Sequence, residues 1–453
     1  MAAGSAIGLT ERLARGPASA AELTQALGIS QPTLSRLLRP LERSGCVVRI
    51  GSTRGARYGL ARAVGAVGSR WPLYAIDESG RPTEIGILHA IERERYVVRG
   101  GPQRIAGQSE GLPYFLQDSR PAGFLGRAIP AAHSDLGLPP RVADWTDAHV
   151  LTYLTQRGSD NVGNLIVGTS ALDHYLRGDH GPQLVKPRER AKRYPALAAS
   201  AMAGAPPGSS AQGEHPKFAA QIADPRRRHH VLVKFSPPRT TPLGQRWGDL
   251  LVAEHVAAAL LRGSGIAAAQ TELLECNDQV FLQSERFDRV GAEGRRGVVT
   301  LYAVDLDRYG KLDSWTQSAS RLCADRLLSP ADTELITLLD VFGALIANSD
   351  RHFGNVTLYD PYEGPFQLAP AYDMLPMLFA PQDGQIVPRN FEPPTPTAAT
   401  LAVWPRARDL AERYWASLCA EPRLSAGFRG IAAECLDAVR AIPQRRGSRV
   451  LAG

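Results

Sequence analysis

The sequence predicts an α+β fold, in which an N-terminal winged helix-turn-helix precedes a two-lobed fold of the protein-kinase type. Three features carry this prediction. Residues 10–60 contain three short helical patterns followed by two alternating segments, which is the order of a winged helix. Further along, Lys234 interrupts an apolar strand. Asp350, Asn355 and Asp373 then follow at the spacing with which protein kinases hold a catalytic base and two magnesium ligands.

Length and composition indicate the domain organisation. A chain of 453 residues, 44% hydrophobic and 21% charged, exceeds one usual core and is typical of a soluble globular protein. We expect three domains, at residues 1–65, 66–185 and 186–443. The net charge of +7 suits a polyanionic partner such as nucleic acid or nucleotide, although a composition rich in Ala, Arg, Gly and Pro explains the charge equally well.

Membrane and disulfide-rich classes are disfavoured. The sequence has no run of about 18 uncharged apolar residues, and residues 1–8 lack the basic region and apolar core of a signal peptide. We therefore expect a cytoplasmic protein without a membrane partner. The five cysteines are widely spaced and form no C-x-x-C pair, which argues against a disulfide framework and a zinc site.

The helical patterns of the first domain carry end signals. Ser19 has the residue type and place of an N-cap, Gly28 is expected to stop the second helix, and Ser30 is expected to cap the third. Pro40 should kink or shorten the end of that third helix. Residues 46–50 and 56–60 are expected to form the two strands of the wing.

The third helix has one apolar and one polar face. Its apolar face is made by Leu34, Leu37, Leu38 and Leu41. Its other face offers hydroxyl, amide and guanidinium groups that can contact base edges and phosphates, namely Gln31, Thr33, Ser35, Arg36 and Arg39. This pattern resembles bacterial winged-helix regulators and predicts DNA binding, with a homodimer because such proteins often read two half-sites. A protein docking module with a solvated polar face is the alternative.

The segment from residue 66 to 185 indicates no chemistry. Strands are expected at 73–77, 95–99 and 165–167, with a helix face over 148–154 and a turn at 158–163. Residues 201–213 are rich in Ala, Gly, Pro and Ser, which is typical of a mobile loop.

Lys234 lies in the apolar strand expected at residues 231–235. Burying an ammonium group costs free energy unless an anion lies beside it, and a nucleotide phosphate would supply that anion. The alternative is that Lys234 lies exposed on an edge strand. The helical pattern over residues 247–261 carries Glu254 among apolar positions. Glu254 is expected to pair with Lys234, as the strand lysine and helix glutamate do in protein kinases, unless it is solvated.

Residues 280–289 run from a strand into a polar segment and follow Lys234 where a kinase has its hinge. The backbone groups of a hinge hydrogen-bond adenine. Glu285 and Phe287 would be the hinge residues, and the Phe287 ring would also line the site of the adenine base.

A sharp turn follows the apolar helix expected over residues 335–345, before strands at 357–359 and 366–369. Asp350 would accept the proton of the incoming hydroxyl, and Asn355 and Asp373 would coordinate the magnesium that meets the phosphates. His352 would orient this loop or contact phosphate. A structural hairpin without chemistry is the alternative.

With these motifs in this order, residues 66–443 resemble the HipA family of bacterial serine/threonine kinase toxins. The resemblance implies ATP and Mg²⁺ as cofactors, catalytic roles for Asp350, His352 and Lys234, and a place for Tyr372 beside Asp373 at the nucleotide. It also implies a loop that covers the phosphates and carries an autophosphorylated serine. That loop matches Ser209, Ser210, Ala211, Gln212, Gly213 and Glu214. Gln212 stands where relatives have glycine, and a flexible linker between lobes is the alternative.

The better-known HipA proteins borrow a DNA-binding domain from a separate antitoxin, whereas this chain carries one in front. It resembles the fused subgroup that includes the YjjJ toxin-like proteins. The resemblance implies a protein kinase that arrests growth by phosphorylating a translation component such as an aminoacyl-tRNA synthetase, with DNA and an antitoxin as further partners. Two alternatives stay open, a DNA-binding regulator whose kinase-like body senses a nucleotide or partner, and a small-molecule kinase.

Overall fold

The structure is a computed structural model and describes residues 2–51, 55–178, 182–204, 215–225 and 227–443. The chain divides into two compact units. The first contains residues 1–182, 288–299 and 360–364, and the second contains residues 183–287, 300–359 and 365–453. The observed mixture of helices and sheets confirms the predicted α+β class.

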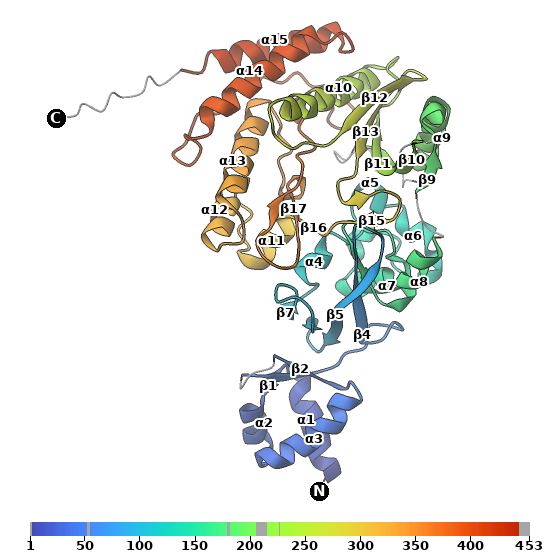
Figure 1. The fold of residues 1–453 in the computed structure, drawn as a ribbon, viewed down its shortest axis with the longest axis vertical. Coiled ribbons are helices and arrows are strands. Elements are labelled where there is room, and N and C mark those ends of the chain that lie inside the picture. The colour runs from blue at the N-terminus through green and yellow to red at the C-terminus, as the bar shows by residue number, and fades with distance from the viewer. Residues whose placement is uncertain (1, 52–54, 179–181, 205–214, 226, 444–453) are drawn as a thin grey trace, which may run out of the picture. The chain divides into compact units, whose positions relative to one another are not determined.

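The first unit begins with a winged helix, drawn in blue in Figure 1. Its elements are α1 (Ala2–Ala14), β1 (Ala18–Ser19), α2 (Ala20–Leu27), α3 (Gln31–Arg43), β2 (Val47–Ile50) and β3 (Arg57–Leu60). The strands form one sheet in the order β1-β3-β2. Buried leucines from all three helices fill its core, including Leu9, Leu23, Leu34 and Leu38.

The caps of α2 follow the prediction. Ser19 and Glu22 form a reciprocal capping box, and Gly28 ends the helix in the left-handed region at φ 62°. The shortening expected at Pro40 is wrong, because α3 continues to Arg43. The Ser44 N–H donates to the Pro40 carbonyl at 2.9 Å, so the helical bonding resumes beyond the proline, and burial of the leucine face holds the helix together.

The middle of the first unit is a sheet with strand order β7-β6-β5-β4-β8 and short helices after it. Its elements are β4 (Arg70–Ile76), β5 (Pro82–Ile91), β6 (Arg95–Arg99), β7 (Gly107–Glu110), α4 (Tyr114–Gln117), α5 (Gly123–Gly126), α6 (Ile129–Ala132), α7 (Asp147–Arg157), β8 (Leu165–Val167) and α8 (Thr169–Arg177). All the strands and the helix predicted here are present. The longest strand, β5, was not predicted.

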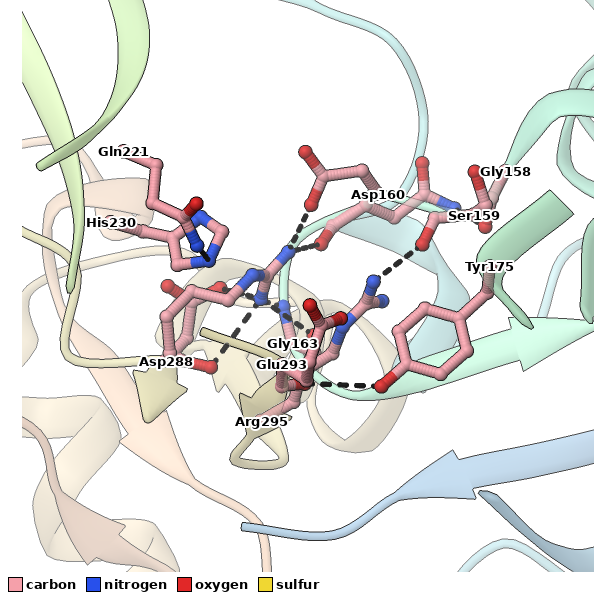
Figure 2. A network of polar contacts seen from close by, with 12 residues as sticks. Gly158, Ser159, Asp160, Gly163, Tyr175, Gln221, His230, Asp288, Glu293 and Arg295 are labelled. Atoms are coloured by element: carbon pink, nitrogen blue, oxygen red, sulfur yellow. Dashed lines mark hydrogen bonds and ion pairs between the residues drawn. The ribbon is translucent and has the colours of Figure 1, made fainter. Parts of the chain in front are cut away.

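A distant piece of chain, residues 288–299, completes the first unit with β14 (Arg289–Val290) and β15 (Gly294–Arg295). The Arg289 guanidinium donates to Asp160 at 2.8 Å and to Asp288 at 2.7 Å. Arg295 donates to the Ser159 carbonyl at 2.6 Å and lies over the Tyr175 ring. Figure 2 shows Asp160, Asp288 and Arg295 converging in this network. These contacts fix the returning segment to the unit.

Removing the Arg289 guanidinium should destabilise the first unit. Its side chain is 2% exposed and faces the carboxylates of Asp288 and Asp160, so Arg289→Met removes the guanidinium that neutralises the buried Asp288 carboxylate. We expect a loss of about 3–5 kcal/mol in the free energy of unfolding, measured by thermal and urea denaturation. Arg81→Gln, at an exposed position just before β5 in the same unit, is the control and should leave Tm unchanged. An Arg289→Met protein as stable as the control would contradict this account.

The second unit contains a sheet with strand order β12-β13-β11-β10-β9, flanked by helices. Its elements are β9 (Gln183–Val185), α9 (Arg190–Ala203), β10 (Lys217–Ala223), β11 (Arg228–Phe235), α10 (Pro242–Gly263), β12 (Thr271–Cys276), β13 (Gln279–Glu285), α11 (Leu301–Arg308), α12 (Trp315–Ala324), α13 (Pro330–Leu345), β17 (Thr357–Tyr359), β18 (Gln367–Leu368), α14 (Trp404–Ala420) and α15 (Ala426–Arg440). Strand β16 (Val298–Thr300) contains residues of both units.

Helices pack against this sheet and against one another. Tyr194 and Ala198 of α9 join the apolar core on one face of the sheet. Helices α12 and α14 both pack against α13, and α15 packs against α14 (Figure 1). The mobile loop predicted from residue 201 is wrong at its start, because residues 201–203 are the last turn of α9, whose alanine-rich end favours helix. Within the described ranges, no helix combines the length and apolar character that a membrane crossing requires.

Candidate active site

Lys234 of β11 is held between two carboxylates of the second unit. Its ammonium donates to both oxygens of Glu254 in α10, each at 2.8 Å, and also contacts Asp373. The side chains of Lys234 and Glu254 are 13% and 5% exposed. The predicted contact between them is confirmed, and the structure adds Asp373 to the same cation.

Lys234 and Asp373 stabilise each other's charges. Burial opposes a charge on Lys234, but the Asp373 and Glu254 carboxylates outweigh burial and raise the pKa of Lys234 above its usual value. Burial likewise raises the pKa of Asp373, yet Lys234 and Lys217 reverse this and bring it below the usual range. For Glu254, burial prevails and raises the pKa. Lys234 is therefore a fixed cation and Asp373 a fixed anion at neutral pH.

The loop after α13 is fastened to the chain around Asp373 by one buried amide. The Asn348 side chain accepts the Asp350 N–H at 3.0 Å and donates to the Asp373 carbonyl at 3.2 Å. Ala347 and Asp373 both have positive φ, 58° and 55°, a region that L-residues rarely adopt. Asn348 thus fixes the distance between the two segments that present the acids. Asn348 lies two residues before Asp350, and the sequence did not reveal this linking role.

Asn355 closes the same loop. Its side-chain N–H donates to the Asp350 carbonyl at 2.8 Å, which leaves the amide oxygen with no hydrogen-bond partner among the described residues. His352 accepts the Gly354 N–H on Nδ1 at 3.1 Å, and its carbonyl accepts the Trp315 indole N–H at 3.2 Å. The His352 ring therefore shapes the loop. Partial burial raises the pKa of Asp350, which makes its carboxylate a stronger proton acceptor.

These groups surround a cavity of about 100 Å³. Of the predicted residues, Lys234, Asp350, His352 and Asp373 line it, and Glu254 joins them; Asn355, Glu285, Phe287 and Tyr372 are absent from its lining. The volume is smaller than the roughly 300–1,000 Å³ of most ligand pockets, so this is a charged subsite. Further lining residues, which we did not predict as site residues, are His215, Lys217, Trp247, Leu375 and Met377.

Two of the unpredicted residues come from the strand before Lys234 and its approach. Lys217 is the register partner of Lys234 across β10 and β11, so the two lysines share one face of the sheet. His215 packs edge-on against Trp247, with ring centroids 4.7 Å apart. Burial, together with Lys234 and Lys217, lowers the pKa of His215 to about 3, so its ring is neutral. The pairing of β10 with β11 brings Lys217 to the cavity, and packing against Trp247 holds His215 there.

Aromatic rings of the second unit adjoin the loop that carries Asp350. The rings of Phe287 and Tyr372 lie 5.8 Å apart, and Tyr359 meets Phe287 edge-on. The Tyr372 hydroxyl donates to the Gly354 carbonyl at 2.6 Å. Phe287 and Tyr372, both predicted to contact nucleotide, are thus brought together.

The side chain of Glu285 does not lie on the sheet face that carries Lys234. It pairs with Val231 in the ladder, whereas Lys234 pairs with Leu282, so the carboxylate of Glu285 lies on the opposite face. There it forms two hydrogen bonds of 2.7 Å with Arg227. The Phe287 N–H has no hydrogen-bond partner among the described residues. The Phe287 N–H is therefore the group of the predicted hinge that is available to a ligand.

The predicted phosphate loop lies outside the described residues. This applies to Ser209 and Ser210 as sites of autophosphorylation and to residues 211–214 as phosphate contacts.

Oxygen donors around the loop suit magnesium. Asp373 offers a carboxylate and Asn355 an amide oxygen, both ligand types that Mg²⁺ prefers. Among the described residues, no group of three or more His, Cys, Asp or Glu side chains could hold a metal by itself.

Sequence comparison relates all three parts of the chain to known families. Residues 209–443 match the model of the HipA-like C-terminal domain, residues 67–176 the middle domain of YjjJ-like toxins, and residues 11–57 the MarR family. The protein Toxin YjjJ of Escherichia coli (strain K12) is 37% identical over 440 residues, which is 96% of this chain and 98% of that protein. The chain belongs to the YjjJ family of HipA-like toxins. The MarR match gives this YjjJ-family chain a winged helix of MarR type.

Solved structures relate the YjjJ-family chain to HipA in fold. The HipA of Shewanella oneidensis MR-1, solved with HipB and operator DNA, has a TM-score of 0.55 and 14% identity, and the match covers 82% of this chain and 97% of that one. The Helicobacter pylori proinflammatory kinase CtkA has a TM-score of 0.34 and 16% identity, with 47% of this chain and 84% of that one covered. The first of these shows the HipA-like fold.

Proposed function

We propose that this YjjJ-family chain is an ATP- and magnesium-dependent serine/threonine protein kinase of the HipA toxin type. Its substrate would be a translation component such as an aminoacyl-tRNA synthetase, whose phosphorylation arrests growth. The observation that carries the proposal is the convergence of Lys234, Glu254, Asp373 and Asp350 on one cavity. A hairpin with a purely structural role would not require a buried lysine held by two carboxylates beside a third acid.

Each residue has a separate role in this proposal. Lys234 holds a positive charge against the nucleotide phosphates, and Glu254 fixes its position. Asp350 orients the incoming hydroxyl and accepts its proton, and Phe287 presents its N–H and ring to adenine. Asn355 and Asp373 would hold magnesium, which would neutralise charge on the transferred phosphoryl group. Asn348 keeps the acid and the metal side of the site in register.

Labelling of a cell extract tests the proposal. The purified chain should transfer the γ-phosphate of radiolabelled ATP to a serine or threonine of an extract protein when Mg²⁺ is present. Identification of the labelled band by mass spectrometry would name the substrate. Label on a small metabolite would favour a small-molecule kinase, and no transfer with any extract would overturn the kinase proposal.

We also propose that the winged helix binds DNA through α3. Gln31, Arg36 and Arg39 are exposed along the helix, whereas Leu34 and Leu38 are buried. The Arg36 guanidinium lies within hydrogen-bonding distance of Thr33 on the same face. This combination of exposed amide, hydroxyl and guanidinium groups supports contacts to bases and phosphates.

Replacing the two arginines should weaken DNA binding. Arg36→Gln/Arg39→Gln removes two positive charges, so we expect lower affinity for the chain's own promoter region and a salt dependence reduced by about one unit of slope per lost phosphate contact. Fluorescence anisotropy at several salt concentrations measures both effects. Arg188→Gln, which removes one exposed positive charge in the second unit, is the control and should bind DNA as the wild type does. Equal binding by the double variant and the control would argue for a docking module instead.

A further inference from the structure

An open cleft lies within the first unit, where the winged helix meets the middle sheet. Its volume is about 510 Å³, which is in the range of small-ligand sites. One wall is the end of α3 and the start of β2, with Glu42, Arg43, Ser44, Gly45 and Val47. The other wall belongs to β4, β5 and β6 and the residues beside them, with Ser69, Arg70, Ile87, His89, Arg99 and Gly100.

The two walls are joined by backbone hydrogen bonds and a shared apolar cluster. The Glu92 N–H donates to the Leu60 carbonyl at 2.9 Å, and the Arg62 N–H donates to the Ala90 carbonyl at 3.0 Å. Val48 of the wing packs with Ile91 and Val97 of the middle sheet. The shape of the cleft is therefore fixed by the fold and does not depend on long surface side chains alone.

The cleft carries an excess of positive charge. Arg43, Arg70 and Arg99 line it together with one acid, Glu42. Within the described part of the chain, none of these arginines forms an ion pair with a carboxylate. The carbonyl end of α3 adds about half a negative charge. Three guanidiniums outweigh this end and Glu42, so the cleft attracts anions.

A buried imidazole reaches the floor of the cleft. His89 is 7% exposed and has no hydrogen-bond partner among the described residues. It is the register partner of Arg70 across β4 and β5. Burial, with Arg99 and Arg70, lowers the pKa of His89 to about 4, so the ring is neutral at pH 7 and offers one N–H donor. His89 lines the cleft together with Arg70 and Arg99, so its ring N–H can donate to an anion bound there.

We propose that this cleft binds a small phosphorylated anion, with Arg70 and Arg99 on its phosphate oxygens and His89 donating from the floor. Guanidinium groups bind phosphate through paired N–H bonds, and a neutral imidazole adds a directed one. The concave shape and the buried position of His89 favour a small ligand over the convex backbone of duplex DNA. Because both the winged helix and the sheet contribute residues, the bound anion bridges the two.

Calorimetric titration with inorganic pyrophosphate in EDTA tests this site on the full chain. The wild type should bind, and Arg70→Gln/Arg99→Gln should weaken that binding by at least about tenfold, as expected for lost hydrogen bonds between charged groups. Both arginines are exposed, so the double variant should keep the wild-type Tm. Arg81→Gln, which removes one exposed positive charge just before β5, is the control and should bind as the wild type does. Lys234→Met should retain the binding, which separates the cleft from the kinase site.

Three results would overturn the proposal. One is unchanged pyrophosphate binding by Arg70→Gln/Arg99→Gln. Another is loss of binding in Lys234→Met, which would assign the pyrophosphate to the kinase site. The third is a wild type that does not bind pyrophosphate, combined with a double variant that binds duplex DNA more weakly than the wild type does. This result would make the cleft a contact for the DNA backbone.

Discussion

Asp350→Ala should reduce transfer of γ-phosphate to protein by roughly 10²–10⁴-fold and release the cells from growth arrest. The Asp350 carboxylate lines the cavity, and its raised pKa suits a group that accepts a proton from a hydroxyl. Its side chain makes no hydrogen bond within the described residues, so truncation should leave the fold intact. Labelling of extract with radioactive ATP, with growth curves of cells expressing each variant, measures the effect.

The control for this experiment is Asp409→Asn, which removes one negative charge at an exposed position of α14. It should label protein as the wild type does. If Asp350→Ala still arrested growth while Arg36→Gln/Arg39→Gln abolished the arrest, the kinase proposal would give way to a DNA-binding regulator whose kinase-like body senses a nucleotide or partner.

Lys234→Met should abolish transfer and also destabilise the second unit. The ammonium that neutralises Glu254 and Asp373 is lost, and Glu254 is left almost fully buried with a like charge nearby. Breaking a buried ion pair from one side costs about 3–5 kcal/mol, which corresponds to a fall in Tm of roughly 10 °C for a unit of this size. Thermal denaturation followed by circular dichroism measures the fall.

A second substitution separates the structural from the chemical effect. Lys234→Met/Glu254→Gln removes the unpaired buried charge, so it should recover part of the lost stability while remaining inactive. Lys186→Met is the control, because its ion pair with Glu189 is long and exposed, and its Tm should match the wild type. A double variant less stable than Lys234→Met would show that Glu254 is stabilised by contacts other than this lysine.

Local patterns were sufficient for much of the fold. The end signals at Ser19 and Gly28 predicted α2, and the strands expected at residues 95–99 and 357–359 are β6 and β17 with those bounds. These features depend on neighbours within a few positions, where propensity and periodicity act. Strand β5 was missed because Pro82 and Gly86 interrupt it and its stability comes from pairing with both β4 and β6.

The candidate site was likewise predictable from the sequence only in part. The sequence by itself determined the chemically distinctive groups, since the spacing of Asp350 and Asn355 and a lysine in an apolar strand are visible locally. Only the tertiary structure decided that Asn348 links the two acidic segments, that Lys217 lies beside Lys234, and that residues 288–299 complete the first unit. It also placed Arg70 and Arg99 in one cleft with His89. Such contacts depend on strand register and on long-range packing, which join residues that no local pattern connects.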